Sequence, residues 1–301
     1  MKKLIFDPQQ FSGRMTIVCF ISGSGTNYRE IVAKNREHDY LVFTNRPGCP
    51  GTIIAKQNNH EIIELSHWPY LKEAKRKYGS GMTPRNSDER IRYEQEVSRL
   101  IENKLGKIPD LICLAGYDQW LTDWTVERYY PRILNVHPGD TTKSYDGLHW
   151  VPTAKAIIAG DESIRSTLFF VDKGEDTGPI LMQSAPLNIS GTLDELEARG
   201  SKGLLTAFRK VTSFIKVQEI ISYDSFIQKA DEELKYFMEL ICSNLQDALK
   251  IAGDWQIYPV VVHDFISKGR VEVDDRNVYI DQQKIPPHGL RLVKHRVNPS
   301  Q

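Results

Sequence analysis

Short apolar runs alternate with helix-like stretches through the first 180 residues of the chain. Five of these runs have the length and composition of buried strands, and Ser87 is placed to cap a helix that ends near Leu105. Strands that alternate with helices form βαβ units on a parallel sheet. The pattern therefore predicts an α/β fold with a doubly wound, mostly parallel sheet. The five predicted strands are residues 16–21, 40–44, 109–114, 133–136 and 167–171.

The pattern changes after Asn188, where helical periodicity replaces the short apolar runs. Thr192 and Glu195 have the spacing of a capping box. Such amphipathic helices are usually packing elements or oligomer contacts, so we expect a structural role and keep a homodimer as an alternative. Residues 270–273 and 278–280 flank a polar turn and predict a closing β-hairpin. The two helical stripes are Leu204, Phe208, Val211 and Ile215, then Leu234, Phe237, Ile241, Leu245 and Leu249.

The balance of charge favours a small-molecule ligand. Lysine plus arginine equals aspartate plus glutamate at 39 each, so no overall field attracts nucleic acid or an acidic membrane surface. The 4 cysteines are far apart in the sequence, which is typical of a reduced, cytoplasmic protein. We also expect no signal peptide and no membrane span, because no apolar stretch approaches about 20 residues.

The run at residues 133–136 leads into Asn135-Val136-His137-Pro138. Side chains two residues apart point to the same face of a strand, so Asn135 and His137 should converge where Pro138 ends it. Ligands of open α/β sheets bind at such strand ends. A later loop, residues 172–179, supplies carboxylates that can orient an imidazole. Together these groups describe direct acyl transfer without a covalent intermediate, with the amide stabilising an oxyanion.

Two other site types remain weaker interpretations. A metal site fits poorly because His137, His149 and Asp176 lack compact ligand spacing. The turn at residues 22–27, Ser-Gly-Ser-Gly-Thr-Asn, stands between a strand and a helix, where backbone N–H groups can hold a phosphate. It matches neither a P-loop nor the dinucleotide fingerprint, so a redox enzyme is disfavoured. Phosphate binding and a plain turn both stay open for this loop.

These motifs together resemble the folate-dependent formyltransferases, and in particular the branch that acts on glycinamide ribonucleotide. The asparagine-x-histidine-proline motif and the later aspartate-x-glycine are shared across that family. The first glycine loop and the tail point to the branch. The resemblance rests on residues 21–27, 44–48, 114–117, 133–138, 147–149, 176–179, 257–259 and 285–289.

The resemblance implies transfer of a formyl group from 10-formyltetrahydrofolate to the amine of glycinamide ribonucleotide, without a metal. It implies that Asn135 and His137 stabilise and protonate the oxyanion and that Asp176 positions His137. The residues it implies for the substrate are Gly25, Thr26, Asn27, Tyr28 and Arg29 for the phosphate and Asp254 for the ribonucleotide. Those implied for the folate are Arg90, Asp118, Gln119, Trp120, Leu121, Asn135, Asp172, Lys173, Gly174, Glu175 and Asp176.

From the resemblance we also expect one formyltransferase domain over residues 1–301. Within it we expect a helical insertion at 200–244 and a C-terminal extension with a hairpin at 255–295. The chain departs from the family pattern in three places. Residues 139–142 are Gly-Asp-Thr-Thr where the family has serine, two leucines and proline. Residues 118–121 are Asp-Gln-Trp-Leu in place of Met-Arg-Ile-Leu, and Val151 replaces a histidine. Two alternatives therefore remain: a formyltransferase for another phosphorylated or sugar amine, and a non-catalytic nucleotide-binding regulator.

Overall fold

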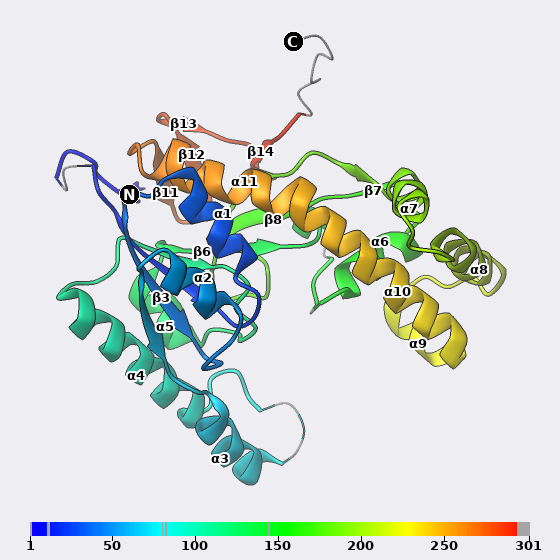
Figure 1. Ribbon diagram of the computed structural model, residues 1–301, viewed down its shortest axis with the longest axis horizontal. Coiled ribbons are helices and arrows are strands. Elements are labelled where there is room, and N and C mark those ends of the chain that lie inside the picture. The colour runs from blue at the N-terminus through cyan, green and yellow to red at the C-terminus, as the bar shows by residue number, and fades with distance from the viewer. Residues whose placement is uncertain are drawn as a thin grey trace. The chain divides into compact units, whose positions relative to one another are not determined.

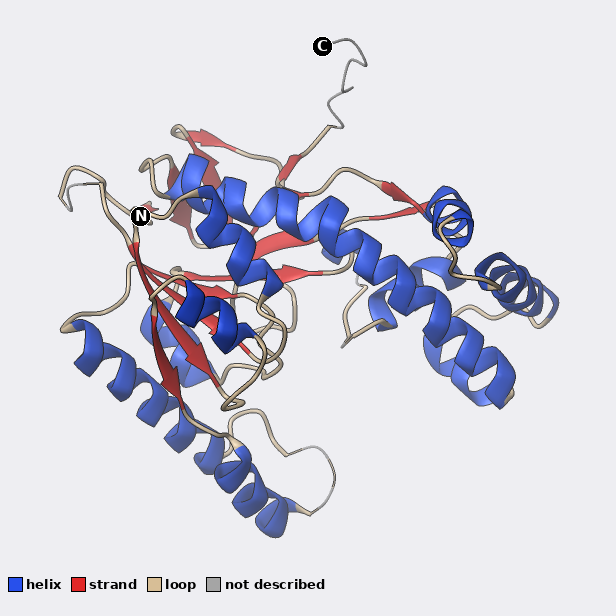
Figure 2. Ribbon diagram, viewed as in Figure 1, coloured by secondary structure: helices blue, strands red, loops and turns tan. Residues whose placement is uncertain are grey.

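The computed structural model describes residues 2–10, 13–79, 81, 83–143, 145–147 and 149–293. Its largest sheet has eight strands in the order β14-β9-β8-β6-β5-β2-β3-β4 (Figures 1 and 2). Strand β10 pairs with β7 in a small separate sheet. The bounds are Thr16–Ile21 (β2), Asp39–Thr44 (β3), Glu61–Glu64 (β4), Leu111–Leu114 (β5), Ile133–His137 (β6), Ser163–Ile164 (β7), Thr167–Phe170 (β8), Ile180–Gln183 (β9), Leu187–Asn188 (β10) and Leu290–Arg291 (β14).

The central strands are parallel, as the alternating pattern predicts. Strand β2 lies between β3 and β5, and Cys19 is opposite Val42 on one side and Cys113 on the other. Every residue of β2 is buried, which explains why its sequence is a continuous apolar run. The predicted α/β fold class is confirmed, and the five predicted strands are present with bounds shifted by at most two residues.

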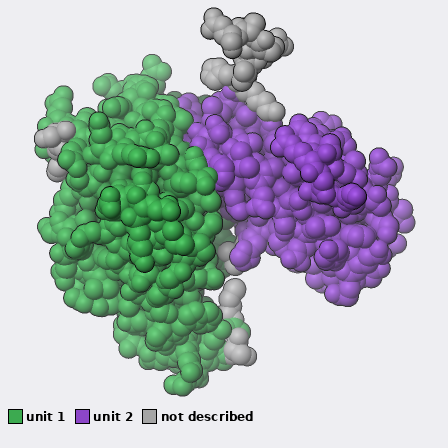
Figure 3. All heavy atoms as spheres, in the orientation of Figure 1, with its two compact units in different colours: residues 1–136, 169–181, 258–287 green, residues 137–168, 182–257, 288–301 purple. Residues whose placement is uncertain are grey.

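Contacts divide the chain into two compact units, coloured separately in Figure 3. Unit 1 comprises residues 1–136, 169–181 and 258–287, and unit 2 comprises residues 137–168, 182–257 and 288–301. Strand β6 runs across the boundary between residues 136 and 137.

Two helices of unit 1, α4 and α5, begin at a side-chain cap. Ser87 accepts a hydrogen bond from the backbone N–H of Arg90 at 3.4 Å, which confirms the predicted start of α4. Thr122 caps α5 in the same way, accepting from the N–H of Thr125. The bounds are Thr26–Lys34 (α1), Gly51–Gln57 (α2), Trp68–Tyr78 (α3), Asp88–Leu105 (α4) and Asp123–Tyr129 (α5).

Unit 2 contains a helical group that has its own apolar core. Leu204, Val211, Ile241, Leu245 and Leu249 from the two predicted stripes are buried in that core, which confirms their packing role. The bounds of its helices are Val151–Ile158 (α6), Ile189–Ala198 (α7), Leu204–Val217 (α8), Tyr223–Lys229 (α9) and Glu232–Leu249 (α10), and a 3-10 turn spans Thr141–Lys143.

The predicted capping box at Thr192 and Glu195 is wrong. Helix α7 begins at Ile189, and its cap is Asn188, four residues before Thr192. The side chain of Asn188 accepts from the N–H of Gly191 at 2.7 Å. Thr192 lies inside the helix and its hydroxyl donates to the carbonyl of Asn188 at 2.6 Å. The amide oxygen of Asn188 satisfies the first turn, so the threonine is not needed there.

The chain continues from α10 through π-helical turns, Lys250–Asp254 and Val261–Ile266, on either side of α11, Trp255–Val260. The predicted hairpin is confirmed as β11, Val271–Asp274, and β12, Asn277–Ile280. These two strands join β1, Lys3–Leu4, and β13, Gln283–Lys284, in an antiparallel sheet. Residues 294 and 295 of the expected extension lie outside the described residues. Within the described residues, no helix is both long and apolar enough to cross a membrane.

Candidate active site

His137 is the last residue of β6 and its side chain is held firmly. The residue is 4% exposed, and its Nε2–H donates to the carbonyl oxygen of Tyr145 at 2.7 Å. A Cβ atom placed on Gly139 would lie only 3.1 Å from the ring atoms Cδ2 and Nε2. The ring is therefore fixed by a hydrogen bond to one loop residue and by close packing against a residue that has no side chain.

Asn135 and Asp176 lie in unit 1. Asn135 is half-buried in β6, two residues before His137. Because side chains alternate along a strand, both residues are on the same face of β6. Asp176 is half-buried in the loop between β8 and β9, with a positive φ of 50° that aspartate tolerates better than most residues. That loop is closed by Asp172, whose Oδ1 accepts from the N–H of Gly174 at 2.9 Å and the hydroxyl of Thr177 at 2.8 Å.

The glycine loop before α1 is shaped by a close backbone approach. Gly25 has φ 68°, and a Cβ there would lie 2.7 Å from the Cα of Gly51. The loop therefore needs glycine for packing, whatever it binds. Gly25 precedes α1 without a side-chain cap, and the first N–H groups of a helix have no acceptor within the helix itself. The side chain of Tyr28 is fully buried and hydrogen-bonds His60 at 2.6 Å, so only its backbone suits a phosphate.

Three of the residues implied for the folate line one cavity in unit 1. Arg90, Gln119 and Trp120 enclose it together with His67, Tyr70, Leu71, Tyr93 and Glu94. Guanidinium and aromatic rings are groups that bind a carboxylate and a flat ring. The cavity holds about 20 Å³, enough for about one water molecule. The Nη2 atom of Arg90 donates to the carbonyl of Trp120 at 2.9 Å, which holds two of the lining residues together.

A polar network at three strand ends was missed in the sequence. Ser22 follows β2, Asn45 follows β3 and Asp118 follows β5. Ser22 Oγ donates to Asn45 Oδ1 at 2.6 Å, and Asn45 Nδ2 donates to Asp118 Oδ1 at 2.8 Å. Burial favours a raised pKa for Asp118, but hydrogen bonds from Asn45, Gln119 and Ser22 and the charge of Arg46 outweigh it and lower the pKa. Asp118 thus stays ionised as the centre of this network.

Arg85 was also missed, although it ties together the two segments implied for the folate. Its Nε donates to the carbonyl of Leu121 at 2.6 Å, and its Nη1 donates to the carbonyl of Lys173. A single arginine in a loop before α4 carries no signal of this role, because its partners are backbone atoms far away in the sequence.

Asp254 lies in unit 2 at the end of a π-helical turn and is 5% exposed. Its Oδ1 accepts a hydrogen bond from Ser166 Oγ at 2.5 Å. A Cβ on the preceding Gly253 would lie 2.5 Å from the same Ser166 Oγ, so the glycine allows the approach. The serine therefore fixes the carboxylate that is implied for the ribonucleotide.

Residues 15–211, more than half of the chain, match the family model described as formyl transferase. The chain belongs to the formyl transferase family. This confirms the family resemblance drawn from the motifs. The matched region ends within α8, so α9, α10 and the C-terminal hairpin lie outside it.

Two curated relatives of this formyl transferase bear names from purine biosynthesis. The chain is 24% identical over 284 residues to the phosphoribosylglycinamide formyltransferase of Escherichia coli, covering 91% of this chain and 98% of that protein. It is 29% identical over 210 residues to the trifunctional purine biosynthetic protein adenosine-3 of Drosophila melanogaster, which covers 67% of this chain and spans only 14% of that protein.

Solved structures of the family share the fold. The phosphoribosylglycinamide formyltransferase of Coxiella burnetii aligns with a TM-score of 0.58 at 21% identity, covering 93% of this chain and 100% of that chain. The mostly parallel sheet with its helices is therefore the fold of this family.

Proposed function

We propose that the chain transfers a formyl group from 10-formyltetrahydrofolate to the amine of glycinamide ribonucleotide in the cytoplasm. The observation that carries the proposal is the end of β6, where a formyl transferase chain presents Asn135 and a firmly held His137. The relatives named for this activity support the choice of acceptor.

In the proposed reaction, the amine nitrogen attacks the formyl carbon directly. The carbonyl oxygen becomes an oxyanion, to which the Asn135 amide donates a hydrogen bond. His137 helps to stabilise the oxyanion by proton transfer. As the oxyanion collapses, the C–N bond to the folate breaks, and the proton that the attacking amine loses reaches the leaving nitrogen by way of Asp176 and His137. Asp176 orients the imidazole and takes up the proton that the attacking amine loses.

The binding roles extend the same proposal. The N–H groups at the start of α1, in the segment of Gly25, Thr26, Asn27, Tyr28 and Arg29, would hold the phosphate, helped by the helix dipole. Asp254 would face the ribonucleotide. Segments 118–121 and 172–176, tied together by Arg85, would hold the folate, with Arg90 as the partner of its carboxylate.

The test is to mix the protein with 10-formyltetrahydrofolate and glycinamide ribonucleotide and follow the deformylated folate. His137→Ala should reduce turnover by about two to four orders of magnitude, the usual weight of general acid–base catalysis. His288→Ala is a matched control, because His288 is half-buried in the C-terminal segment and has no proposed role.

The outcomes separate the alternatives. A His137→Ala variant with near-normal rate refutes the catalytic assignment. Turnover with another amine but not with glycinamide ribonucleotide rejects the acceptor and keeps the reaction. Folate or nucleotide binding without turnover of any amine supports a regulatory protein instead.

A further inference from the structure

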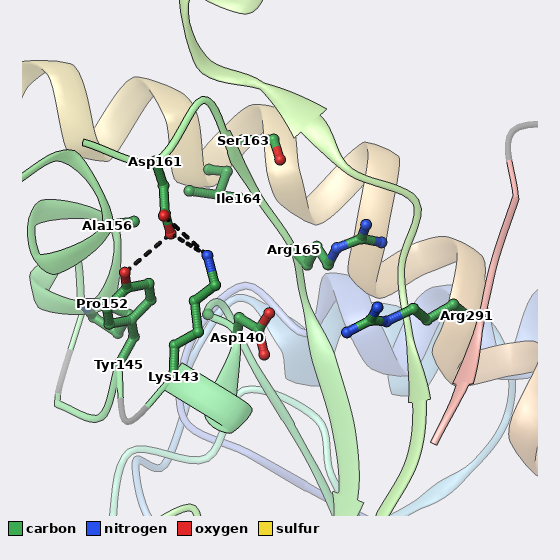
Figure 4. A pocket seen from close by; sticks show the side chains of 11 residues that line it. Asp140, Lys143, Tyr145, Pro152, Ala156, Asp161, Ser163, Ile164, Arg165 and Arg291 are labelled. Atoms are coloured by element: carbon green, nitrogen blue, oxygen red, sulfur yellow. Dashed lines mark hydrogen bonds and ion pairs between the residues drawn. The ribbon is translucent and has the colours of Figure 1, made fainter. Parts of the chain in front are cut away.

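A cavity of about 210 Å³ lies within unit 2, beside the loop that follows His137 (Figure 4). It has space for on the order of ten water molecules, which is also enough for a phosphate or carboxylate group. Three cationic side chains and two carboxylates face it, together with the phenol of Tyr145. The charged residues are Lys143, Arg165, Arg291, Asp140 and Asp161.

The lysine and the two carboxylates are already satisfied within the cavity wall. Lys143 Nζ lies 2.8 and 2.9 Å from the two oxygens of Asp161, which also accepts from the Tyr145 hydroxyl at 3.0 Å. Asp140 Oδ1 accepts from the Gln183 amide at 2.7 Å and from the N–H and hydroxyl of Thr142 at 3.0 and 2.6 Å. These groups form the frame of the cavity.

The two arginines, by contrast, are held by neutral acceptors. Arg165 Nη1 donates to the carbonyl of Ser184 at 2.8 Å, and Arg291 Nε donates to Gln183 Oε1 at 3.0 Å. In the described part of the chain, neither guanidinium forms an ion pair with a carboxylate. Figure 4 shows both guanidinium groups reaching toward the same region of the cavity.

The charges of the two arginines act on each other. Burial lowers the pKa of Arg165, and the nearby charge of Arg291 lowers it further, against a smaller opposing effect of Asp140. Like charges repel each other, and an anion between two cations offsets this repulsion. A guanidinium presents planar, paired donors that match the oxygens of phosphate or carboxylate.

The cavity also adjoins the histidine of the proposed reaction. Gly139 lines the cavity and lies against the His137 ring. A Cβ atom added to Gly139 would be 3.1 Å from the ring atoms Cδ2 and Nε2. Tyr145, another lining residue, accepts the hydrogen bond from His137 through its carbonyl oxygen. A group that enters the cavity is therefore separated from the imidazole by little more than one backbone segment.

We propose that Arg165 and Arg291 bind an oxyanion, a phosphate or a carboxylate, in this cavity. The site is additional to the glycine loop assigned above to the substrate phosphate. The oxyanion has two sources: an acidic group on the amine acceptor itself, or a free anion that regulates the enzyme. Only the first source rests on the proposed function.

The direct test uses the unaltered protein and phenylglyoxal, which modifies arginine side chains. Inorganic phosphate and acetate are added separately, and modification of each arginine is followed by peptide mass spectrometry. We expect either anion to slow modification of both Arg165 and Arg291 at least fivefold. Arg199, which directly follows α7 and has a side chain that is 78% exposed, is the control and should react at an unchanged rate. Unchanged modification of Arg165 and Arg291 overturns the proposal.

Variants then distinguish the sources of the anion. Arg165→Gln and Arg291→Gln should each weaken phosphate binding at least tenfold by calorimetry, whereas Arg165→Lys should retain part of it. If the anion belongs to the acceptor, KM for that acceptor rises about tenfold in both glutamine variants and kcat stays within about threefold. If the anion is free, KM is unchanged and the effect of phosphate on the rate disappears.

The two proposals fail separately. Protection from phenylglyoxal without turnover of glycinamide ribonucleotide refutes the proposed function and keeps the anion site. Turnover without protection, and with equal phosphate binding in the double glutamine variant, refutes the anion site alone.

Discussion

Gly139→Ala tests whether the ring of His137 is positioned by close packing. The added Cβ would lie 2.9 Å from Pro152 Cβ and 3.1 Å from two ring atoms of His137. Carbon atoms in ordinary contact are about 3.5–4.0 Å apart, so the shortfall is at least about 0.6 Å at the proline and about 0.4 Å at the ring. Pro152 is buried in the first turn of α6 and cannot move easily. The imidazole therefore has to shift.

The magnitude follows from that shift. Overpacking of this size costs about 1–3 kcal/mol of the free energy of unfolding. A displacement of 1 Å costs about a hundredfold in rate, so a ring displaced by a few tenths of an ångström should lower kcat on the order of tenfold. The shift also lengthens the 2.7 Å hydrogen bond from His137 to Tyr145. Serine, the residue that the family pattern places here, meets the same contacts and should behave similarly.

The assay is formyl transfer under conditions where circular dichroism shows the variant to be folded, with urea unfolding measured in parallel. Gly81→Ala is the control, because an added Cβ at Gly81 meets no described atom within 4 Å. A Gly139→Ala variant with unchanged kcat and unchanged stability would show that the ring is not held by this contact. Loss of stability with unchanged kcat would show that the ring position does not limit the reaction.

Four further predictions concern stability and folate entry. Burial lowers the pKa of His263 from its ordinary value of 6.5 to about 4. At a pH between these two values, His263 is neutral in the folded protein and takes up a proton when the protein unfolds. Stability should fall as the pH drops from 6.5 toward 4, and His263→Gln should remove on the order of 3 kcal/mol of that loss in urea titrations at several pH values. Glu94→Ala should cost about 3 kcal/mol in urea unfolding, because its buried carboxylate accepts three hydrogen bonds at the start of α5. Folate binding should change tryptophan fluorescence, and Trp120→Phe should abolish that change if the indole closes the cavity beside Arg90. If residues 1–301 are one domain with an insertion at 200–244, calorimetry should show one unfolding transition, and two separate transitions would reject it.

Much of the fold could be predicted because each signal is local. A buried parallel strand needs a run of apolar residues, as in β2, and a helix cap needs one side chain, as with Ser87. The capping box at Thr192 failed for a local reason too, because Asn188 offers another cap four residues earlier. Sequence alone does not decide between two adequate caps.

The arrangement of the candidate site could be predicted only where one segment carries its residues. Asn135 and His137 stand on one strand, so a period of two residues relates them. Ser22, Asn45 and Asp118 form one network but follow three different strands. Their positions after neighbouring parallel strands are a usable signal, since the carboxyl ends of such strands meet at one edge. Arg165 and Arg291 are far apart in the sequence and give no such signal.

The departures from the family pattern after Pro138 are connected in the structure. Gly139 makes room for the His137 ring, and its carbonyl accepts from Thr167 Oγ1 at 2.7 Å. Asp140 Oδ1 accepts a hydrogen bond from the Gln183 amide nitrogen, and Gln183 Oε1 accepts one from Arg291 Nε. A leucine at position 140, as in the family pattern, could accept no hydrogen bond, so the Gln183 amide would lose its 2.7 Å bond to Asp140 and keep the 3.3 Å bond to Thr167 Oγ1. Asp140 is thus linked to Arg291 through Gln183. We infer that the end of β6 determines the reaction and that this cavity determines what is bound beside it.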